Sequence, residues 1–195
     1  VKDKEEAFIT YDKCNSLKEV SENMSLKQSK ISIICKLLNL SLYERRYVLP
    51  IYSSILGGSS NSRLFTNVRE KNSLCYTVNS ISNTPNSMLM IYAGIDASNY
   101  DKALKLIKKE IKLKNITNEE LENSKKELIS SVETLFDSTT GIINYYYGIE
   151  VFKADDIDTK IKNFNKVSIN DLESLSKKIE IAMIYFLKGE GNDKK

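Results

Sequence analysis

Residues 56–76 read LGGSSNSRLFTNVREKNSLCY, and they carry the densest local signals in the 195-residue chain. The glycine pair indicates the end of a helix, because glycine readily adopts the backbone conformations found just after one. The apolar residues of SRLFTNV fall on one face of a helix, which is predicted over residues 61–71. A turn at Asn72 and Ser73 then leads into a strand predicted over residues 74–82.

Two local interpretations of this stretch rest on the residues alone. A Gly/Ser turn before a helix offers backbone N–H groups and a positive dipole end to an anion. However, GGSSNSR lacks the GxxxxGK[ST] spacing of a P-loop and the GxGxxG of a dinucleotide site. In the second interpretation the stretch is structural: the glycines end one helix, and Ser60 or Ser62 caps the next. Arg69 would then lie in solvent near a helix C-terminus, where a cation is mildly favoured.

The flanking sequence predicts further strands and helices. Runs of apolar and β-branched residues predict strands over residues 30–38, 88–95 and 179–187. A short turn joins the second of these to the strand before it, so the two form a hairpin. Residues 18–23 fit either a short strand or an arm. A helix predicted over residues 41–56 should bend or begin near Pro50. Another is predicted over residues 98–113 with Ser98 as its cap, and a long one starts at the capping box Thr117-Asn118-Glu119-Glu120. Two more are predicted, one over residues 141–153 and one capped by Ser168.

This order of elements predicts an α+β fold. Helices would pack on one face of a mostly antiparallel or mixed sheet. The length fits one domain over residues 1–195, with a polar N-terminal arm over about residues 1–18. Because the first residue is valine rather than methionine, we expect the chain to be a fragment of a longer protein.

The composition excludes several kinds of function. The chain has no histidine, which removes Ser-His and Cys-His nucleophile pairs and HExxH zinc sites from it. A net charge of +3 is too balanced to favour nucleic acid, and no apolar run approaches a membrane span of about 20 residues. Cys14, Cys35 and Cys75 form no CxxC motif, and we expect buried thiols in a reducing compartment, hence the cytoplasm.

Other candidate groups have structural explanations. Cap and loop roles account for the paired carboxylates at residues 119–120 and 155–156. Consecutive tyrosines at residues 145–147 could line a cavity, but packing explains them as well, since neighbouring helix residues point in different directions. The lysines of residues 102–114 form the outer, solvated face of an amphipathic helix.

The pattern GGxxxSRLFxxVREKxxLxY resembles the hallmark of the C-terminal-half domains of insulinase/pitrilysin-like (M16-like) zinc peptidases, the family that includes mitochondrial processing peptidases. A looser similarity extends over roughly residues 20–190. The resemblance implies a metallopeptidase half-domain fold (LuxS/MPP-like). The ending Tyr-Phe-Leu-Lys-Gly is similar to a bacterial subgroup associated with 5-aminopentanol modification of translation elongation factor P.

The resemblance also implies a divided active site. An N-terminal half of related fold carries an inverted zinc motif, HxxEH, and the C-terminal half contributes an Arg and a Tyr seven residues apart. Those positions are Arg69 and Tyr76 here. The phenol would stabilise charge that develops on a substrate carbonyl, and the guanidinium would hold the peptide. On the predicted strand, Tyr76 would share a face with Val78. Two positions depart from the family pattern: Ser73 stands where glycine is common, and Cys75 stands where glycine or alanine is usual.

The resemblance therefore implies a peptide-binding domain that holds no metal or cofactor itself, with zinc in the N-terminal half. The expected partners are that half, a homologous subunit and a peptide substrate, and the chain alone should be inactive. As an alternative, the parent protein is a non-catalytic subunit or scaffold that pairs with an active homologue. A third interpretation, an unrelated α+β ligand-binding domain, would be favoured if Arg69 and Tyr76 pointed to opposite sides of the sheet.

Overall fold

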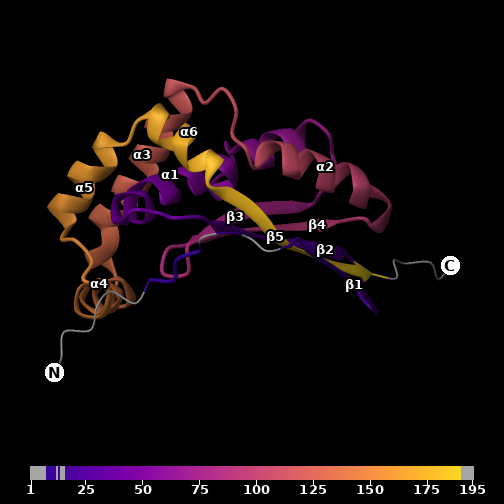
Figure 1. The fold of residues 1–195 in the computed structure, drawn as a ribbon, viewed down its shortest axis with the longest axis horizontal. Helices are drawn as coiled ribbons and strands as arrows, with labels where there is room; N and C mark the ends of the chain where they lie inside the picture. Colours follow the sequence, from indigo (N-terminus) through magenta and orange to yellow (C-terminus); the bar gives the residue numbers. More distant parts are fainter. Residues whose placement is uncertain (1–7, 12, 14–15, 190–195) are drawn as a thin grey trace.

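A computed structural model describes residues 8–11, 13 and 16–189 and shows a layer of helices over one face of a sheet (Figure 1). This arrangement confirms the α+β fold predicted from the sequence. Much of the predicted polar arm, and Cys14 within it, lies outside the described residues. Residues 18–23, which fitted either a strand or an arm, belong to a strand.

The sheet has five strands in the order β1-β5-β2-β4-β3. β1 pairs parallel to β5, and the other three pairings are antiparallel, so the sheet is mixed as predicted. The last strand of the chain thus lies between the first two. The strand bounds are β1 Lys18–Met24, β2 Ser29–Leu37, β3 Thr77–Asn83, β4 Met88–Ile95 and β5 Ile179–Gly189.

The helices come mainly in two blocks, one between β2 and β3 and one between β4 and β5. In the first block, α1 lies inside a longer helical run that has wide turns on both sides. The bounds in the first block are Glu44–Val48, α1 Leu49–Ser53, Ser54–Gly58 and Phe65–Glu70. Those in the second are Ala97–Asn99, α2 Tyr100–Glu110, α3 Asn118–Glu133, Thr134–Asp137, α4 Thr139–Phe152, α5 Ile157–Lys166 and α6 Ile169–Lys177.

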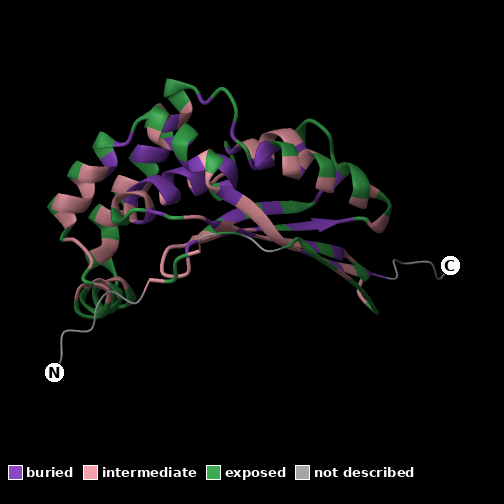
Figure 2. Cartoon of the chain, viewed as in Figure 1, coloured by how far each residue is buried: buried purple, intermediate pink, exposed green. Residues whose placement is uncertain are grey.

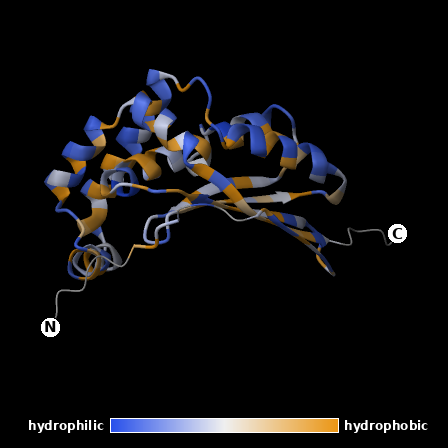
Figure 3. Cartoon of the chain, in the orientation of Figure 1, coloured by the Kyte–Doolittle hydropathy of each residue, from blue (hydrophilic) through white to orange (hydrophobic). Residues whose placement is uncertain are grey.

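The core lies between the sheet and the helices, where Figure 2 shows most of the buried residues. Side chains on a strand alternate between its two faces, and the strands in Figure 3 accordingly carry alternating hydrophobic and hydrophilic bands. In β2 the buried face consists of Ile31, Ile33, Cys35 and Leu37, which are at most 1% exposed. The three residues between them are half-buried, so only one face of the sheet is fully covered.

The predicted helix starts are mostly confirmed. Thr117 accepts a hydrogen bond from the Glu120 N–H at 3.2 Å, and the Glu120 carboxylate accepts one from the Thr117 N–H at 2.8 Å. Ser168 forms the same reciprocal box at the start of α6. The prediction for Ser98 was wrong, because this residue lies inside a short turn of 3₁₀-helix and α2 begins at Tyr100 without a side-chain cap.

Three further details differ from the prediction. Ser62 does not cap the helix that follows it, since its hydroxyl donates to the Ser59 carbonyl at 2.5 Å. The strand predicted over residues 74–82 begins only at Thr77. α5 was not predicted, although Asp156 caps it by accepting a hydrogen bond from the Thr159 N–H at 2.8 Å.

Pro50 and Gly57 shape the first helical run. Pro50 lies at the start of α1, directly after the wide turn Glu44–Val48, so the helical run passes through a residue that has no N–H to donate. The run then presses its backbone against β3, since a Cβ added to Gly57 would lie 2.7 Å from the backbone nitrogen of Ser80. The Ser80 hydroxyl strengthens this contact by donating to the Ser53 carbonyl at 2.6 Å. Gly57 is therefore required for close approach between a helix and a strand.

Replacing Gly57 with alanine tests this contact. Gly57→Ala must push the helical run away from β3, and we expect it to lower the free energy of unfolding by about 2 kcal/mol. The matched control is Gly58→Ala, whose added Cβ would meet its nearest neighbour, the Ser54 side chain, at 3.4 Å. Urea unfolding of both variants checks the prediction. Equal stability of the two variants would show that the chain absorbs the clash without cost.

Candidate functional site

The two predicted site residues line the same open pocket. Arg69 comes from the end of the helical segment Phe65–Glu70, and Tyr76 immediately precedes β3. The pocket has a volume of about 350 Å³. Its walls also include Glu70, Ser73, Leu74, Cys75, Asp96 and Asn99. Because Arg69 and Tyr76 line one pocket, they do not point to opposite sides of the sheet, the arrangement that would have favoured an unrelated ligand-binding domain.

A tight reversal of the chain brings the two residues together. The Ser73 N–H donates to the Arg69 carbonyl at 2.9 Å, and the Leu74 N–H donates to the Val68 carbonyl at 3.0 Å. Ser73 itself has φ 49°, in the left-handed region that favours glycine. This backbone conformation explains why glycine is common at this position in the family that the chain resembles. Ser73 adopts the conformation here in its place.

Hydrogen bonds to β4 and to the Asp96 carboxylate hold Tyr76 in place. Its N–H donates to the Gly94 carbonyl at 2.8 Å, and its hydroxyl lies 2.9 Å from each carboxylate oxygen of Asp96. The hydrogen bond to Asp96 raises the pKa of the Tyr76 phenol, because it stabilises the protonated form. The phenol is therefore a hydrogen-bond donor at neutral pH. Asp96 was not predicted as a site residue.

The face predicted for Tyr76 was wrong. Tyr76 is 55% exposed and Thr77 is also exposed, whereas Val78 is buried. Strand alternation begins only at Thr77, which faces Gly94 in the register of β3 and β4. Because the Tyr76 N–H binds the carbonyl of the same Gly94, the chain is irregular at this point. The irregularity turns the tyrosine out of the core.

Arg69 is held only loosely. Its guanidinium lies 4.6 Å from the centre of the Phe65 ring, and its Nε is 3.7 Å from a carboxylate oxygen of Glu70. Both charged side chains are more than 40% exposed, and such surface ion pairs contribute little to stability. Arg69 can therefore reorient toward a ligand at small cost.

The remaining reactive groups of this region do not form a nucleophile or a metal site. Burial raises the pKa of the Cys75 thiol to about 11, although Arg69 opposes the shift, so the sulfur stays protonated. Cys35 and Cys75 are both buried, as predicted. Within the described ranges, no group of three or more Cys, Asp or Glu side chains is placed to hold a metal ion. In the same ranges, no helix is both long and apolar enough to cross a membrane.

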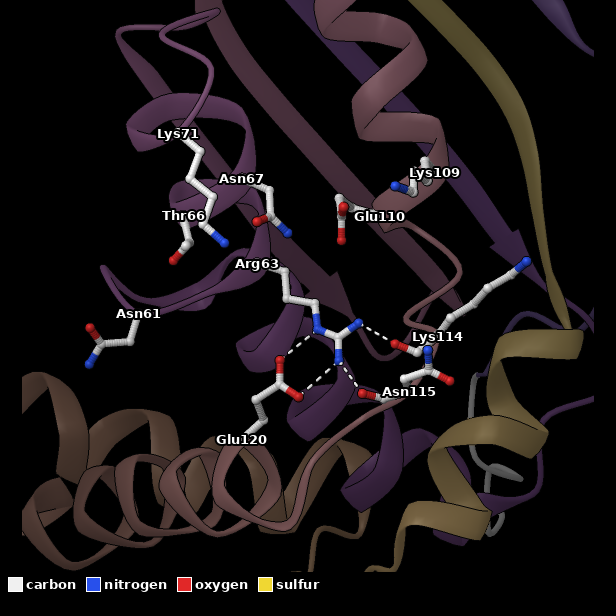
Figure 4. A pocket seen from close by; sticks show the side chains of 10 residues that line it. All are labelled: Asn61, Arg63, Thr66, Asn67, Lys71, Lys109, Glu110, Lys114, Asn115 and Glu120. Atoms are coloured by element: carbon white, nitrogen blue, oxygen red, sulfur yellow. Dashed lines mark hydrogen bonds and ion pairs between the residues drawn. The ribbon is translucent and has the colours of Figure 1, made fainter.

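The other arginine of the hallmark, Arg63, has a different role (Figure 4). Its Nε and one terminal nitrogen donate to the two carboxylate oxygens of Glu120 at 2.6 and 2.8 Å. Its remaining hydrogen bonds go to the carbonyls of Lys114 and Asn115 in the loop before α3. The pocket of about 470 Å³ around it is thus built over an ion pair that joins the first helical block to α3.

Arg63 was not singled out from the sequence. One signal was present, since Arg63 is one of only four arginines in a chain that otherwise uses lysine. A guanidinium can bind a carboxylate through two parallel hydrogen bonds and still reach two carbonyls, which a lysine ammonium cannot do with the same geometry. The capping-box role predicted for Glu120 was correct but incomplete.

The Arg63–Glu120 pair should make stability depend on pH. Burial alone would raise the pKa of Glu120, but the hydrogen bonds from Arg63 and Thr117 outweigh it and lower the pKa below the ordinary value of 4.5. The resulting stabilisation is complete above that value and is lost as the pH falls through the folded-state pKa. Glu120→Gln should therefore lower the free energy of unfolding by about 2 kcal/mol at neutral pH and by less in acid.

Urea unfolding at pH 7 and at about pH 3 measures both effects. Glu119→Gln is the matched control, because Glu119 is the exposed neighbour and makes no contact with Arg63. A Glu120→Gln variant whose deficit is the same at both pH values would contradict the ion-pair assignment.

Comparison with known proteins places this geometry in a family. Residues 3–128 match the family described as "Peptidase M16 inactive domain". The chain is 28% identical over 177 residues to the Bacillus subtilis protein named "Probable inactive metalloprotease YmfF", covering 88% of this chain and 41% of that relative. It is 31% identical over 144 residues to "Uncharacterized zinc protease YmxG" of the same organism, covering 70% of this chain and 35% of that relative.

A solved structure shares the fold over nearly the whole chain. A conserved protein from Enterococcus faecalis superposes with a TM-score of 0.84 and 28% identity, over 96% of this chain and 45% of that protein. The chain therefore spans less than half the length of each of these relatives. These matches confirm the resemblance to the C-terminal halves of insulinase-like zinc peptidases, and the chain belongs to the Peptidase M16 inactive domain family.

Proposed function

We propose that this chain is the peptide-binding C-terminal domain of a zinc-dependent peptidase and supplies Arg69 and Tyr76 to a zinc site on a separate N-terminal half. The observation that carries the proposal is that both side chains line one open pocket. The described residues hold no cluster suited to a metal, so the zinc belongs to the other half in this proposal. The chain alone is then inactive, and its partners are that half, a homologous subunit and the substrate peptide.

The pocket has the hydrogen-bonding groups that a peptide requires. A peptide backbone presents carbonyl acceptors and N–H donors in alternation. Arg69 and Tyr76 offer donors, while Asp96 and Glu70 offer acceptors on the same walls. The guanidinium would hold a substrate carbonyl or carboxylate in register.

Asp96 gives Tyr76 its orientation. The carboxylate keeps the proton on the phenol and holds the ring at the pocket wall. When a peptide carbonyl approaches, the phenol would transfer its hydrogen bond from Asp96 to that oxygen. A donor aimed at an oxygen on which negative charge develops accelerates acyl transfer. Asp96 is a positioning residue in this account, because it acts through Tyr76.

A second candidate function has support from one relative. The Bacillus subtilis protein that is 28% identical over most of this chain carries the word "inactive" in its name. The parent of this chain would then be a scaffold that offers substrate contacts to an active homologue. The similarity to the subgroup associated with elongation factor P modification remains a prediction. Either function is compatible with the bacterial cytoplasm that we propose as the location, where buried cysteines such as Cys35 and Cys75 stay reduced.

Kinetics of the full-length parent protein test the role of Tyr76. Tyr76→Phe should lower kcat about 10²-fold on a fluorogenic peptide, with KM nearly unchanged, because the lost donor acts in the transition state. Asp96→Asn should give a smaller loss in kcat. Tyr92→Phe is the matched control, since Tyr92 is an exposed tyrosine on β4 outside the pocket. Unchanged kinetics for Tyr76→Phe would remove this tyrosine from the mechanism.

Metal analysis of the full-length parent protein separates the two candidate functions. A peptidase should bind one zinc ion per chain through its N-terminal half and lose activity when a chelator removes it. A scaffold should bind none. In both cases residues 1–195 alone should hydrolyse no peptide, and hydrolysis by the purified chain would contradict the proposed division of the site.

A further inference from the structure

The helix α4 does not have the burial pattern of the other long helices. It lies at the end of the molecule far from β1, and none of its 14 residues is buried, as Figures 1 and 2 show. The helices α2, α5 and α6 each bury apolar residues and carry several charged ones. By contrast, α4 has a single charged residue, Glu150. A helix that is apolar on all sides normally lies in an interior.

The exposed side of α4 is apolar and continuous. It consists of five side chains that are between 38% and 62% exposed, and we call them the α4 patch: Ile142, Ile143, Tyr146, Tyr147 and Val151. Their spacing of three or four residues makes them neighbours on one side of the helix. Together they expose on the order of 500 Å², a size at which an apolar patch on a single chain is often functional.

The exposure of the α4 patch does not come from a loosely held helix. Ser138 caps the start of α4 with a side-chain hydrogen bond of 3.0 Å. At the other end, Arg46 donates to the carbonyls of Phe152 and Lys153 and pairs with Asp155 at 3.2 Å. Because both ends of α4 are held, the patch is a fixed surface of the fold.

The composition of α4 favours a protein partner over a membrane. Helices that lie on the surface of an anionic membrane carry lysine and arginine on their polar side, and α4 contains neither. Tyrosine, in contrast, is enriched at protein interfaces, because its ring packs against apolar groups while its hydroxyl meets water or a polar group. The two exposed tyrosines of the patch fit that role.

The first described residues of the chain lie beside α4. Phe8 lines a cavity of about 310 Å³ together with Gly148 and Phe152 of α4. The position of the next residue is fixed, since the Ile9 N–H donates to the Pro85 carbonyl at 2.9 Å. A domain that precedes this chain in the same polypeptide is therefore tethered within about 25 Å of Phe8, the longest reach of the residues between them.

We propose that the α4 patch is the surface on which the N-terminal half of the parent protein docks. This inference rests on the proposed function, which includes such a half. The chain spans 41% of one relative and 45% of a solved structure, so more than half of each of those proteins lies outside the region that matches it. A tethered domain has an effective concentration in the millimolar range, so a small patch can hold it. Two separate copies of the chain would each need to bury about 800 Å².

Hydroxyl-radical footprinting of the full-length parent protein and of residues 1–195 tests the proposal. Tyr146 and Tyr147 should be oxidised about fivefold more slowly in the full-length protein, because a packed interface excludes water. Met24 is the control, since it is 50% exposed at the end of β1, far from α4, and its rate should be the same in both proteins. The measurement needs neither zinc nor substrate. A failure of the proposed peptidase function is therefore distinguishable from a failure of this inference.

Variants of the full-length protein test the patch itself. Ile143→Lys combined with Tyr146→Lys places two charges in the patch and should return the oxidation rate of Tyr147 to that in residues 1–195. Met24→Lys, the matched change outside the patch, should leave Tyr147 protected. Circular dichroism of each variant shows that it is folded.

Three results would overturn the proposal. The first is equal oxidation of Tyr146 and Tyr147 in the full-length protein and in residues 1–195. The second is protection of Tyr147 that persists in the double variant. The third is protection in residues 1–195 alone that increases with protein concentration, because a second copy of the chain would then cover α4.

Discussion

The position of the functional stretch depends on one backbone contact, the approach of Gly57 to Ser80. The backbone of the helical run that begins near Glu44 can lie this close to the backbone of β3 because Gly57 has no side chain. That contact fixes where the run stops and where the next helical segment starts. Arg63 then ties this segment to α3 through Glu120 and two loop carbonyls. Gly57 and Arg63 together set the frame from which Arg69 and Tyr76 project.

The hallmark pattern thus divides into a structural part and an exposed part. Both of its arginines are cations, Arg69 in the helical segment Phe65–Glu70 and Arg63 just before it, but they have opposite surroundings. The Arg63 guanidinium is surrounded by acceptors and largely buried, whereas Arg69 has one distant carboxylate and an aromatic ring beside it. A side chain whose hydrogen bonds are already satisfied holds a fold together. One that is loosely held in an open pocket is free to meet a ligand, which is why the proposed function rests on Arg69.

The same comparison applies to the charged groups at the other end of the helical layer. Arg46, Asp155 and Tyr47 satisfy one another, as Arg63 and Glu120 do. Lys160, which is half-buried beside the Tyr145 ring, lies close enough to Asp155 and Asp156 for both carboxylates to stabilise its charge. A partly desolvated charge costs free energy unless a partner compensates it. At the Arg69–Tyr76 pocket, the side chain left without strong protein partners is Arg69, and it is the one assigned to a ligand.

Local sequence determined much of this protein. Runs of apolar and β-branched residues specified β2, β4 and β5, and side-chain caps specified the starts of α3 and α6, because these signals act between residues close in the chain. The pattern ending in Tyr76 identified the family and named Arg69 and Tyr76. The tertiary structure alone decided that Asp96 orients the tyrosine and that Glu120 saturates Arg63. Tyr76 and Asp96 are 20 residues apart in the chain, and Arg63 and Glu120 are 57 apart. Only the tertiary structure brings the members of each pair within hydrogen-bonding distance.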